Sequence, residues 1–287
     1  MGMNMRRVTA VTSTTLLTLS LAATQVSAQE VEELDHLGRV LAKGQIVMST
    51  DPRYPPQSEV NEEGVFEGFD IDVGTEIANR LGVELVATPV LWDVITAGNW
   101  ANRFDMSVGS MAITTPREEV IHFTQPYYFT PAQVAAHADL GYTSVEELAG
   151  QTICVGSATT YFDWFNGTLD LGSLTPDVTP PQGAEVVTRE TDRDCATEWG
   201  AGRMDFQGWI TAAPTVQQAI DDGLPVVAVG DPIFYEPLAV AFDKSVEDSD
   251  TLVEAVDRII GEMHADGTLT DLSMDWYGED LTRQVGE

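Results

Sequence analysis

Short apolar segments alternate with helical patterns early in this chain, and this alternation limits the fold more than any other feature. Residues 45–48 (Gln-Ile-Val-Met) have a strand pattern that ends at a turn. A helical pattern then runs from Gly68 to Gly82, and a second strand pattern, 83–87, follows at once. The apolar spacing and the closing glycine predict the helix. Strands and helices in this order predict an α/β fold with a mostly parallel sheet.

The alternation continues and predicts two units. The first unit also holds a helix at 94–100 and a strand at 106–109. The second starts near Ala136 and alternates helices with strands, namely helices at 145–148, after 159, at 192–200 and at 215–221, and strands at 152–155, 185–187, 204–209 and 225–229. The tail, with a strand at 238–241 and a helix at 252–265, has no sheet of its own. We therefore expect it to join the first unit, which becomes discontinuous.

Acidic residues strongly outnumber basic ones, with 46 Asp and Glu against 14 Lys and Arg and a formal net charge of −32. This charge repels phosphate backbones and anionic membranes, so we expect no nucleic-acid partner. Lys43 and Lys244 are the lysines of the chain. Few lysines and an acid excess favour a surface adapted to high salt, the alternative being a merely acidic exported protein.

The salt interpretation predicts that stability depends on ionic strength. We expect the melting temperature to rise between roughly 0.01 and 1 M NaCl, because the Debye length falls from about 30 to 3 Å and screens the carboxylates from one another. Calorimetry over this range measures the effect. A flat response would remove the argument for salt adaptation.

The first 28 residues have the pattern of an export signal. Arg6 and Arg7 precede an apolar stretch at 8–23, and Val-Ser-Ala at 26–28 resembles a cleavage site. The apolar stretch is shorter than the roughly 20 residues that span a bilayer. Since no cysteine lies near the cleavage site, we expect a diffusible protein of a bacterial periplasm without a lipid anchor.

Cys154 and Cys195 are the cysteines of the chain. In an oxidising compartment two such cysteines are expected to pair. The alternative is two buried free thiols. Since they lack a C-x-x-C spacing and a histidine nearby in the sequence, we expect no metal or redox role for them.

Several motifs together resemble one family. They are Thr-Asp-Pro-Arg-Tyr-Pro-Pro at 50–56, Glu-Gly-Phe-Asp-Ile-Asp at 67–72, the arginine-bearing stretch 104–119 with Phe-Thr-Gln-Pro-Tyr-Tyr at 123–128, and 266–278, which starts with Asp-Gly-Thr-Leu and ends with Trp-Tyr-Gly. In this order they cover nearly the whole mature chain. The chain resembles a type 2 periplasmic solute-binding protein of the amino-acid-type ABC transporters.

The resemblance implies two α/β lobes that close on a small ligand between them. We expect lobe 1 at 29–134 and 236–287, lobe 2 at 135–235, and hinge crossings near 130–136 and 230–238. The implied role is the substrate-binding component of an ABC importer, which takes up a carboxylate-bearing zwitterion and passes it to a permease in the inner membrane. We expect a monomer, and neither a cofactor nor a metal.

The resemblance also implies ligand-binding residues. Arg117 would hold the ligand carboxylate through two parallel hydrogen bonds, the alternative being a surface arginine paired with Glu118 or Glu119. Further contacts are implied for Gly109 and Ser110 through a carbonyl and a hydroxyl, Thr159 and Thr160 through hydroxyls at a helix start, Asp51 and Tyr54 as a ligand wall, and Tyr161 and Trp92. N-capping is the alternative for the threonines and core packing for the aromatic residues.

Two departures from the family leave the ligand open. Ala112 stands where the family has Ser or Thr, and residues 206–211 lack the aspartate that pairs with the ligand ammonium in amino-acid binders. A buried ammonium without a counter-charge is costly. Asp51, Asp231 or Glu236 would then supply the charge. Alternatively, Trp209, Tyr161, Tyr54 and Trp92 would hold a betaine- or ectoine-like cation by cation–π contacts.

An enzyme is the competing class, because some relatives of this fold are dehydratases of cyclic acids. The four histidines, His36, His122, His137 and His264, show no catalytic pairing. Asp51 or Glu236 would have to act as the general acid or base. We therefore expect a binding protein, not an enzyme.

Overall fold

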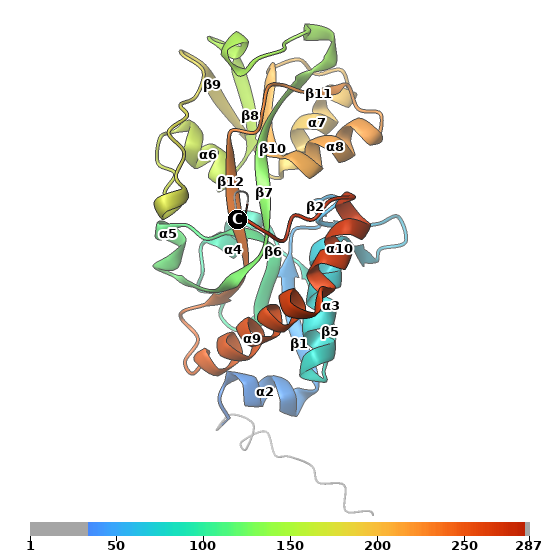
Figure 1. The fold of residues 1–287 in the computed structure, drawn as a ribbon, viewed down its shortest axis with the longest axis vertical. Helices are drawn as coiled ribbons and strands as arrows, with labels where there is room; N and C mark the ends of the chain where they lie inside the picture. Colours follow the sequence, from blue (N-terminus) through green and yellow to red (C-terminus); the bar gives the residue numbers. More distant parts are fainter. Residues whose placement is uncertain (1–33, 285–287) are drawn as a thin grey trace, which may run out of the picture.

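The computed structural model describes residues 34–284, so the predicted export signal lies outside the described residues. Two lobes lie one above the other, and two strands run between them (Figure 1). These crossing strands are β7 (Ile121–His137) and β12 (Phe234–Asp243), which pair with each other in antiparallel fashion. The predicted lobe boundaries, 134/135 and 235/236, fall within them.

The lower lobe of Figure 1 combines segments from both ends of the chain, as the discontinuous layout predicted. Its strands are β1 (Gln45–Thr50), β5 (Glu84–Pro89) and β6 (Met106–Ala112). Its helices are α2 (His36–Lys43), α3 (Phe69–Leu81), α4 (Trp92–Thr96), α5 (Thr115–Glu118), α9 (Asp250–Asp266) and α10 (Thr268–Tyr277). A small sheet of β2 (Arg53–Tyr54), β3 (Ser58–Val60) and β4 (Phe66–Glu67) follows β1 in the chain.

The upper lobe is continuous between the crossings. Its strands are β8 (Thr152–Gly156), β9 (Glu185–Arg189), β10 (Gly208–Ala212) and β11 (Val226–Ala228). Its helices are α6 (Thr160–Phe165), α7 (Asp192–Gly200) and α8 (Ala213–Asp221), with short 3-10 turns at Ala138–Leu140, Val145–Leu148 and Gly172–Leu174.

One nine-stranded sheet runs through both lobes in the order β5-β1-β6-β12-β7-β10-β8-β9, with β11 beside β7. Pairs away from the crossing strands are parallel, as in β1–β5, β1–β6, β8–β9 and β8–β10. Every pair that includes β7 or β12 is antiparallel. The prediction of a mostly parallel sheet is therefore wrong, and the sheet is mixed because the two crossing strands run in opposite directions.

Among the differences in element boundaries, two displace most of the predicted element. The helix expected at 94–100 begins at Trp92 and ends at Thr96, because positive φ angles at Gly98 (66°) and Asn99 (54°) turn the chain out of the helix. The strand expected at 204–209 lies at 208–212 instead. Its register is set by parallel pairing with β8, in which Gly208 lies opposite Ile153.

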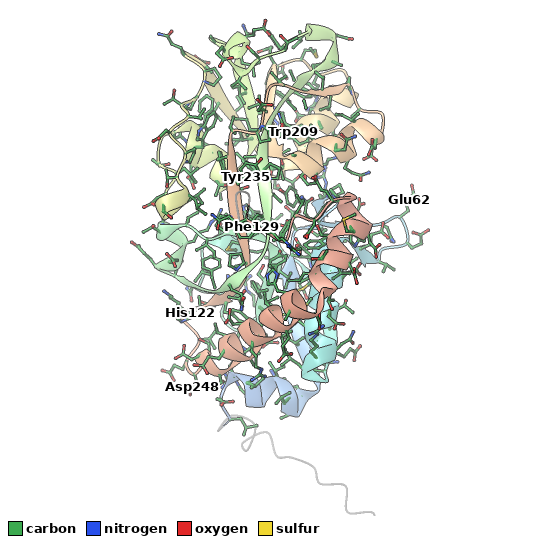
Figure 2. The ribbon with its side chains drawn as sticks, in the orientation of Figure 1. Glu62, His122, Phe129, Trp209, Tyr235 and Asp248 are labelled. Carbon is green, nitrogen blue, oxygen red and sulfur yellow. A yellow bond between two sulfur atoms is a disulfide. The ribbon has the colours of Figure 1, made fainter. Side chains whose placement is uncertain are left out.

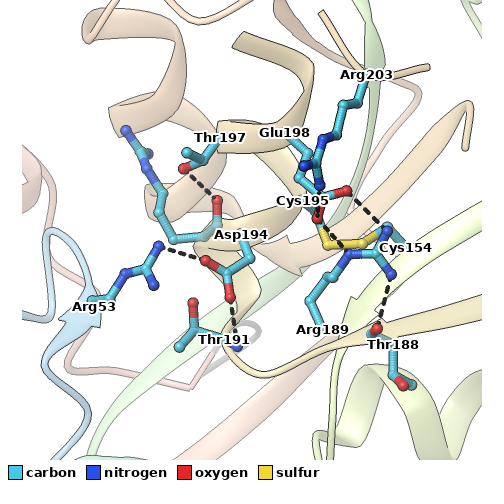
Figure 3. A network of polar contacts seen from close by, with 11 residues as sticks. Arg53, Cys154, Thr188, Arg189, Thr191, Asp194, Cys195, Thr197, Glu198 and Arg203 are labelled. Carbon is cyan, nitrogen blue, oxygen red and sulfur yellow. Dashed lines mark hydrogen bonds and ion pairs between the residues drawn. A yellow bond between two sulfur atoms is a disulfide. The ribbon is translucent and has the colours of Figure 1, made fainter. Parts of the chain in front are cut away.

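The predicted disulfide is confirmed. Cys154 on β8 is bonded to Cys195 on α7, with 6.0 Å between their Cα atoms and a sequence separation of 41. Figure 3 shows this disulfide. Both cysteines are fully buried, in a core that also holds Trp199 and Trp209. The bond therefore ties a strand of the upper lobe to the helix that covers it.

Candidate functional site

A pocket lies where the two lobes meet, with an empty volume of about 460 Å³ including its open mouth. Both lobes and β12 contribute to it. Its walls are Asp51, Tyr54, Trp92, Gly109, Ser110, Ala112, Arg117, Gly156, Ser157, Thr159, Thr160, Tyr161, Glu190, Thr191, Asp192 and Glu236. Interfaces between lobes are common places for the binding sites of small molecules.

The structure brings every predicted ligand-binding residue except Trp209 to this pocket. Trp209 is fully buried in the upper lobe (Figure 2), where its ring lies edge-on to that of Trp199 at a centroid distance of 6.5 Å. It packs in the core around the disulfide and is not a pocket wall. The proposed aromatic enclosure for a cation therefore lacks one of its four members.

Arg117 reaches the pocket from α5 and is only 8% exposed, which argues against a surface arginine. Its Nη1 donates to the Ala112 carbonyl at 3.0 Å, and its Nη2 donates to the Ala158 carbonyl at 2.9 Å. Burial lowers the pKa of Arg117, but an arginine keeps its charge in proteins. Since a guanidinium has five N–H donors, this cation retains donors for a carboxylate.

Ser110 lines the pocket in a left-handed conformation, with a φ of 56°. Its hydroxyl donates to Asp70 Oδ2 at 2.7 Å and also contacts the Tyr128 hydroxyl. Tyr127 donates to the other oxygen of Asp70 at 2.6 Å, and its own hydroxyl accepts the Ser110 N–H at 3.0 Å. Burial raises the pKa of Asp70 to about 7. This network holds Ser110 in place, and the Ser110 hydroxyl is already hydrogen-bonded within the protein.

The two threonines at the start of α6 are also engaged within the protein. Thr159 is the N-cap: its hydroxyl accepts from the Phe162 N–H at 3.3 Å and donates to the Gly156 carbonyl at 2.8 Å. Thr160 donates to Glu236, which lies on the crossing strand β12. The N-capping alternative thus describes Thr159, whereas Thr160 links the upper lobe to the crossing.

Buried carboxylates form the acidic side of the pocket. Burial raises the pKa of Asp51 to about 6 and that of Asp192 to about 7, and it also raises the pKa of Glu236. Asp51 accepts from the Arg53 N–H at 2.8 Å, and Asp192 accepts from the Gly156 N–H at 2.7 Å. A bound cation would favour the charged forms of these acids and lower their pKa values.

The motifs of the sequence located two of these acids and missed others. Asp51 and Glu236 line the pocket, whereas Asp231 is exposed and outside it. Asp192 and Glu190 line the pocket without having been predicted. A usable signal existed, because both follow the strand at 185–187, and ligands of α/β proteins bind at the carboxyl ends of parallel strands.

Residues 34–284 hold neither a membrane-spanning helix nor a cluster of metal ligands. None of the helices described is long and apolar enough to cross a membrane. In the same residues, no group of three or more His, Cys, Asp or Glu side chains is arranged to hold a metal ion.

Comparison with known proteins gives a consistent result. An L-cystine-binding protein of Escherichia coli, TcyJ, is 27% identical over 251 residues, which cover 86% of this chain and 88% of the relative. The solved structure of AncCDT-1, an ancestral amino acid-binding protein and precursor of cyclohexadienyl dehydratase, has a TM-score of 0.71 and 25% identity, covering 84% of this chain and 99% of that one.

Tv2483 bound to L-arginine shares the fold, with a TM-score of 0.73 and 20% identity over 86% of this chain and 96% of that one. These neighbours have the type 2 periplasmic-binding-protein fold expected from the sequence. The model of the bacterial extracellular solute-binding proteins, family 3, matches residues 46–279. The match runs from the first strand of the sheet to the end of the last helix, and the chain belongs to this family.

Proposed function

We propose that the protein is the exported substrate-binding component of an ABC importer and that its pocket holds an amino acid. The carboxylate would bind Arg117, and the ammonium would bind the acidic side. One observation carries this proposal: a buried guanidinium and the buried carboxylates Asp51, Asp192 and Glu236 line the same pocket. Such an arrangement matches the opposite charges of a zwitterion.

Asp192 is the carboxylate that we assign to the ligand ammonium. The family's amino-acid binders place an aspartate in the stretch that here reads 206–211, and Thr211 of that stretch lies beside Asp192. The first residue of α7 thus supplies the charge that β10 lacks. The acidic residues of the pocket outnumber its single arginine, which favours an amino acid with a second positive charge.

The two other ligand and activity classes have less support. A betaine- or ectoine-like cation would be held by aromatic rings and needs no hydrogen-bonded counter-charge. The pocket has three of the four aromatic residues expected for such a ligand, and it also has carboxylates that this ligand does not need. A dehydratase would need a general acid or base beside its substrate. The relative TcyJ is named as a binding protein, which supports a role without catalysis.

Ligand-free protein, prepared by unfolding and refolding, allows a direct test by thermal shift. We expect L-arginine, L-lysine or L-histidine to raise the melting temperature, since a ligand at 100 times Kd adds about 2.7 kcal/mol of stability. Glycine betaine and ectoine should have no comparable effect. Stabilisation by the betaine or ectoine alone would overturn the amino-acid proposal.

The role of Asp192 predicts a loss of affinity in Asp192→Asn. Binding of the amino acid found in the screen should weaken by about 2–5 kcal/mol in calorimetry, because the ammonium loses its charged partner. Asp231→Asn is the matched control, since Asp231 is exposed and outside the pocket, and it should bind normally. Equal affinities of the two variants would show that another acid holds the ammonium.

A further inference from the structure

The Ala158 carbonyl receives two hydrogen bonds from the opposite lobe. Ala158 lies in the upper lobe between β8 and α6, and the donors come from the lower lobe. They are the indole Nε1 of Trp92 at 3.1 Å and Nη2 of Arg117 at 2.9 Å. A carbonyl oxygen has two acceptor sites, so both are used.

The local backbone turns this carbonyl toward the other lobe. Ala158 has a φ of 57°, in the left-handed region that a residue with a Cβ adopts rarely. The preceding residue, Ser157, is held by a hydrogen bond from its N–H to the Arg189 carbonyl at 2.8 Å, and the following residue, Thr159, caps α6. The turn is therefore fixed on both sides of Ala158.

Trp92 and Arg117 also contact each other. The guanidinium carbon lies 5.4 Å from the centroid of the indole, within the range of a cation–π contact. The indole thus orients the guanidinium and donates to the carbonyl that the guanidinium also contacts. The two donors form one unit on the lower lobe.

Other polar contacts between the lobes differ in position and strength. One is a buried hydrogen bond in which the Thr215 hydroxyl donates to Gln57 Oε1 at 3.1 Å. Arg53 pairs with Asp194 at 2.5 Å (Figure 3), but this arginine side chain is 53% exposed, and exposed pairs contribute little. The Thr115 N–H donates to the Asp170 carbonyl at 3.1 Å. The Ala158 contact differs from these because its donors, Trp92 and Arg117, are walls of the pocket itself.

We propose that Trp92, Arg117 and the Ala158 carbonyl form a latch that holds the lobes closed over the pocket. In it the Trp92 indole N–H is a positioning group that favours the closed form. The inference goes beyond the proposed function, since it concerns lobe closure and holds for any ligand. Hinge opening separates the lobes and exposes both donors and the carbonyl to water.

Trp92→Phe tests the latch, because phenylalanine keeps a ring beside Arg117 and lacks the N–H. A hydrogen bond of this kind shifts an equilibrium by about three- to tenfold. We expect the ratio of closed to open molecules to fall by that factor. Since Arg117 still satisfies the carbonyl, the lower end of the range is expected.

Single-molecule energy transfer can measure the ratio of closed to open molecules. The two dyes are attached at Glu119→Cys and Asn166→Cys, which are exposed positions in opposite lobes. The measurement is made without added ligand and then with L-arginine as the probe. Trp164→Phe is the control, since it also removes an indole N–H, but one that donates to the Val178 carbonyl within the upper lobe, and it should close normally. A benzothienyl-alanine at position 92, with sulfur in place of the N–H, should behave like Trp92→Phe.

The outcomes separate the latch from the proposed function. An unchanged closed fraction in Trp92→Phe without ligand would overturn the latch, whatever L-arginine does. A fall for Trp92→Phe but not for the benzothienyl variant would assign the effect to ring size and would also overturn the role of the N–H. Absence of any response to L-arginine in the unsubstituted protein would count against a cationic amino acid and leave the ligand-free test of the latch intact.

Discussion

Arg117→Ala should weaken binding of the amino-acid ligand by several kcal/mol. The guanidinium is buried and contacts carbonyls of both lobes, so its loss removes the charge-assisted bonds and leaves the ligand carboxylate without a counter-charge in the pocket. Arg117→Lys should cost less but still substantially, because the charge remains while the two parallel hydrogen bonds are lost. Calorimetric titration of both variants gives the two differences.

Arg103→Ala is the matched control for this prediction, because Arg103 is an exposed arginine of the same lobe and is not a pocket wall. It should bind as the unsubstituted protein does. Normal binding by Arg117→Ala would overturn the assignment of the whole site, since no other arginine or lysine lines the pocket within residues 34–284.

Removal of the disulfide should cost about 4 kcal/mol of unfolding free energy, the value that the chain-entropy model gives for a loop closed over 41 positions. Urea denaturation of a Cys154→Ala/Cys195→Ala variant, beside oxidised and reduced unsubstituted protein, measures this loss. The bond also lies near the pocket, because Gly156 and Asp192, joined by a hydrogen bond, are close to the two cysteines in sequence. Ligand affinity should therefore fall together with stability.

Thiol labelling controls this experiment. The denatured, unreduced protein should react with no thiol reagent, and after reduction both cysteines should react. Two reactive thiols before reduction would contradict the disulfide. Equal urea midpoints for the oxidised and reduced forms would contradict its contribution to stability.

The sequence predicted the bounds of an element most accurately where a local capping signal marks its start. The helix expected at 192–200 is α7 with the same bounds, because Thr191 and Asp194 form its capping box. The long strand β7 was not predicted as a strand, since Pro126 and Pro131 interrupt its pattern. The structure tolerates Pro126 where the pairing of β7 with β12 shifts register near Ala239.

The pocket residues that could be predicted from the sequence are those that lie in recognisable motifs. The arginine-bearing motif and the opening loop were sufficient to predict Arg117, Asp51 and Tyr54 as neighbours in one pocket. Tertiary packing decided the rest. Trp209 lies in the disulfide core because of how β10 and α7 pack in the upper lobe, and this placement is not visible in the local sequence. Asp192 faces the pocket at the end of a parallel strand, where its position along the chain gave a signal that the motifs did not use.

The position of β12 in the sheet has a consequence for the order in which the molecule is assembled. This strand lies between β6 and β7 but comes late in the chain, after the whole upper lobe. Since the chain is synthesised from its N-terminus, the upper lobe is complete before the lower lobe, which still lacks the strand at its centre. Glu236 and the second crossing arrive together with β12. The pocket therefore gains its last wall only when residue 236 has been added, and a shorter chain does not hold the complete set of side chains that surround the pocket.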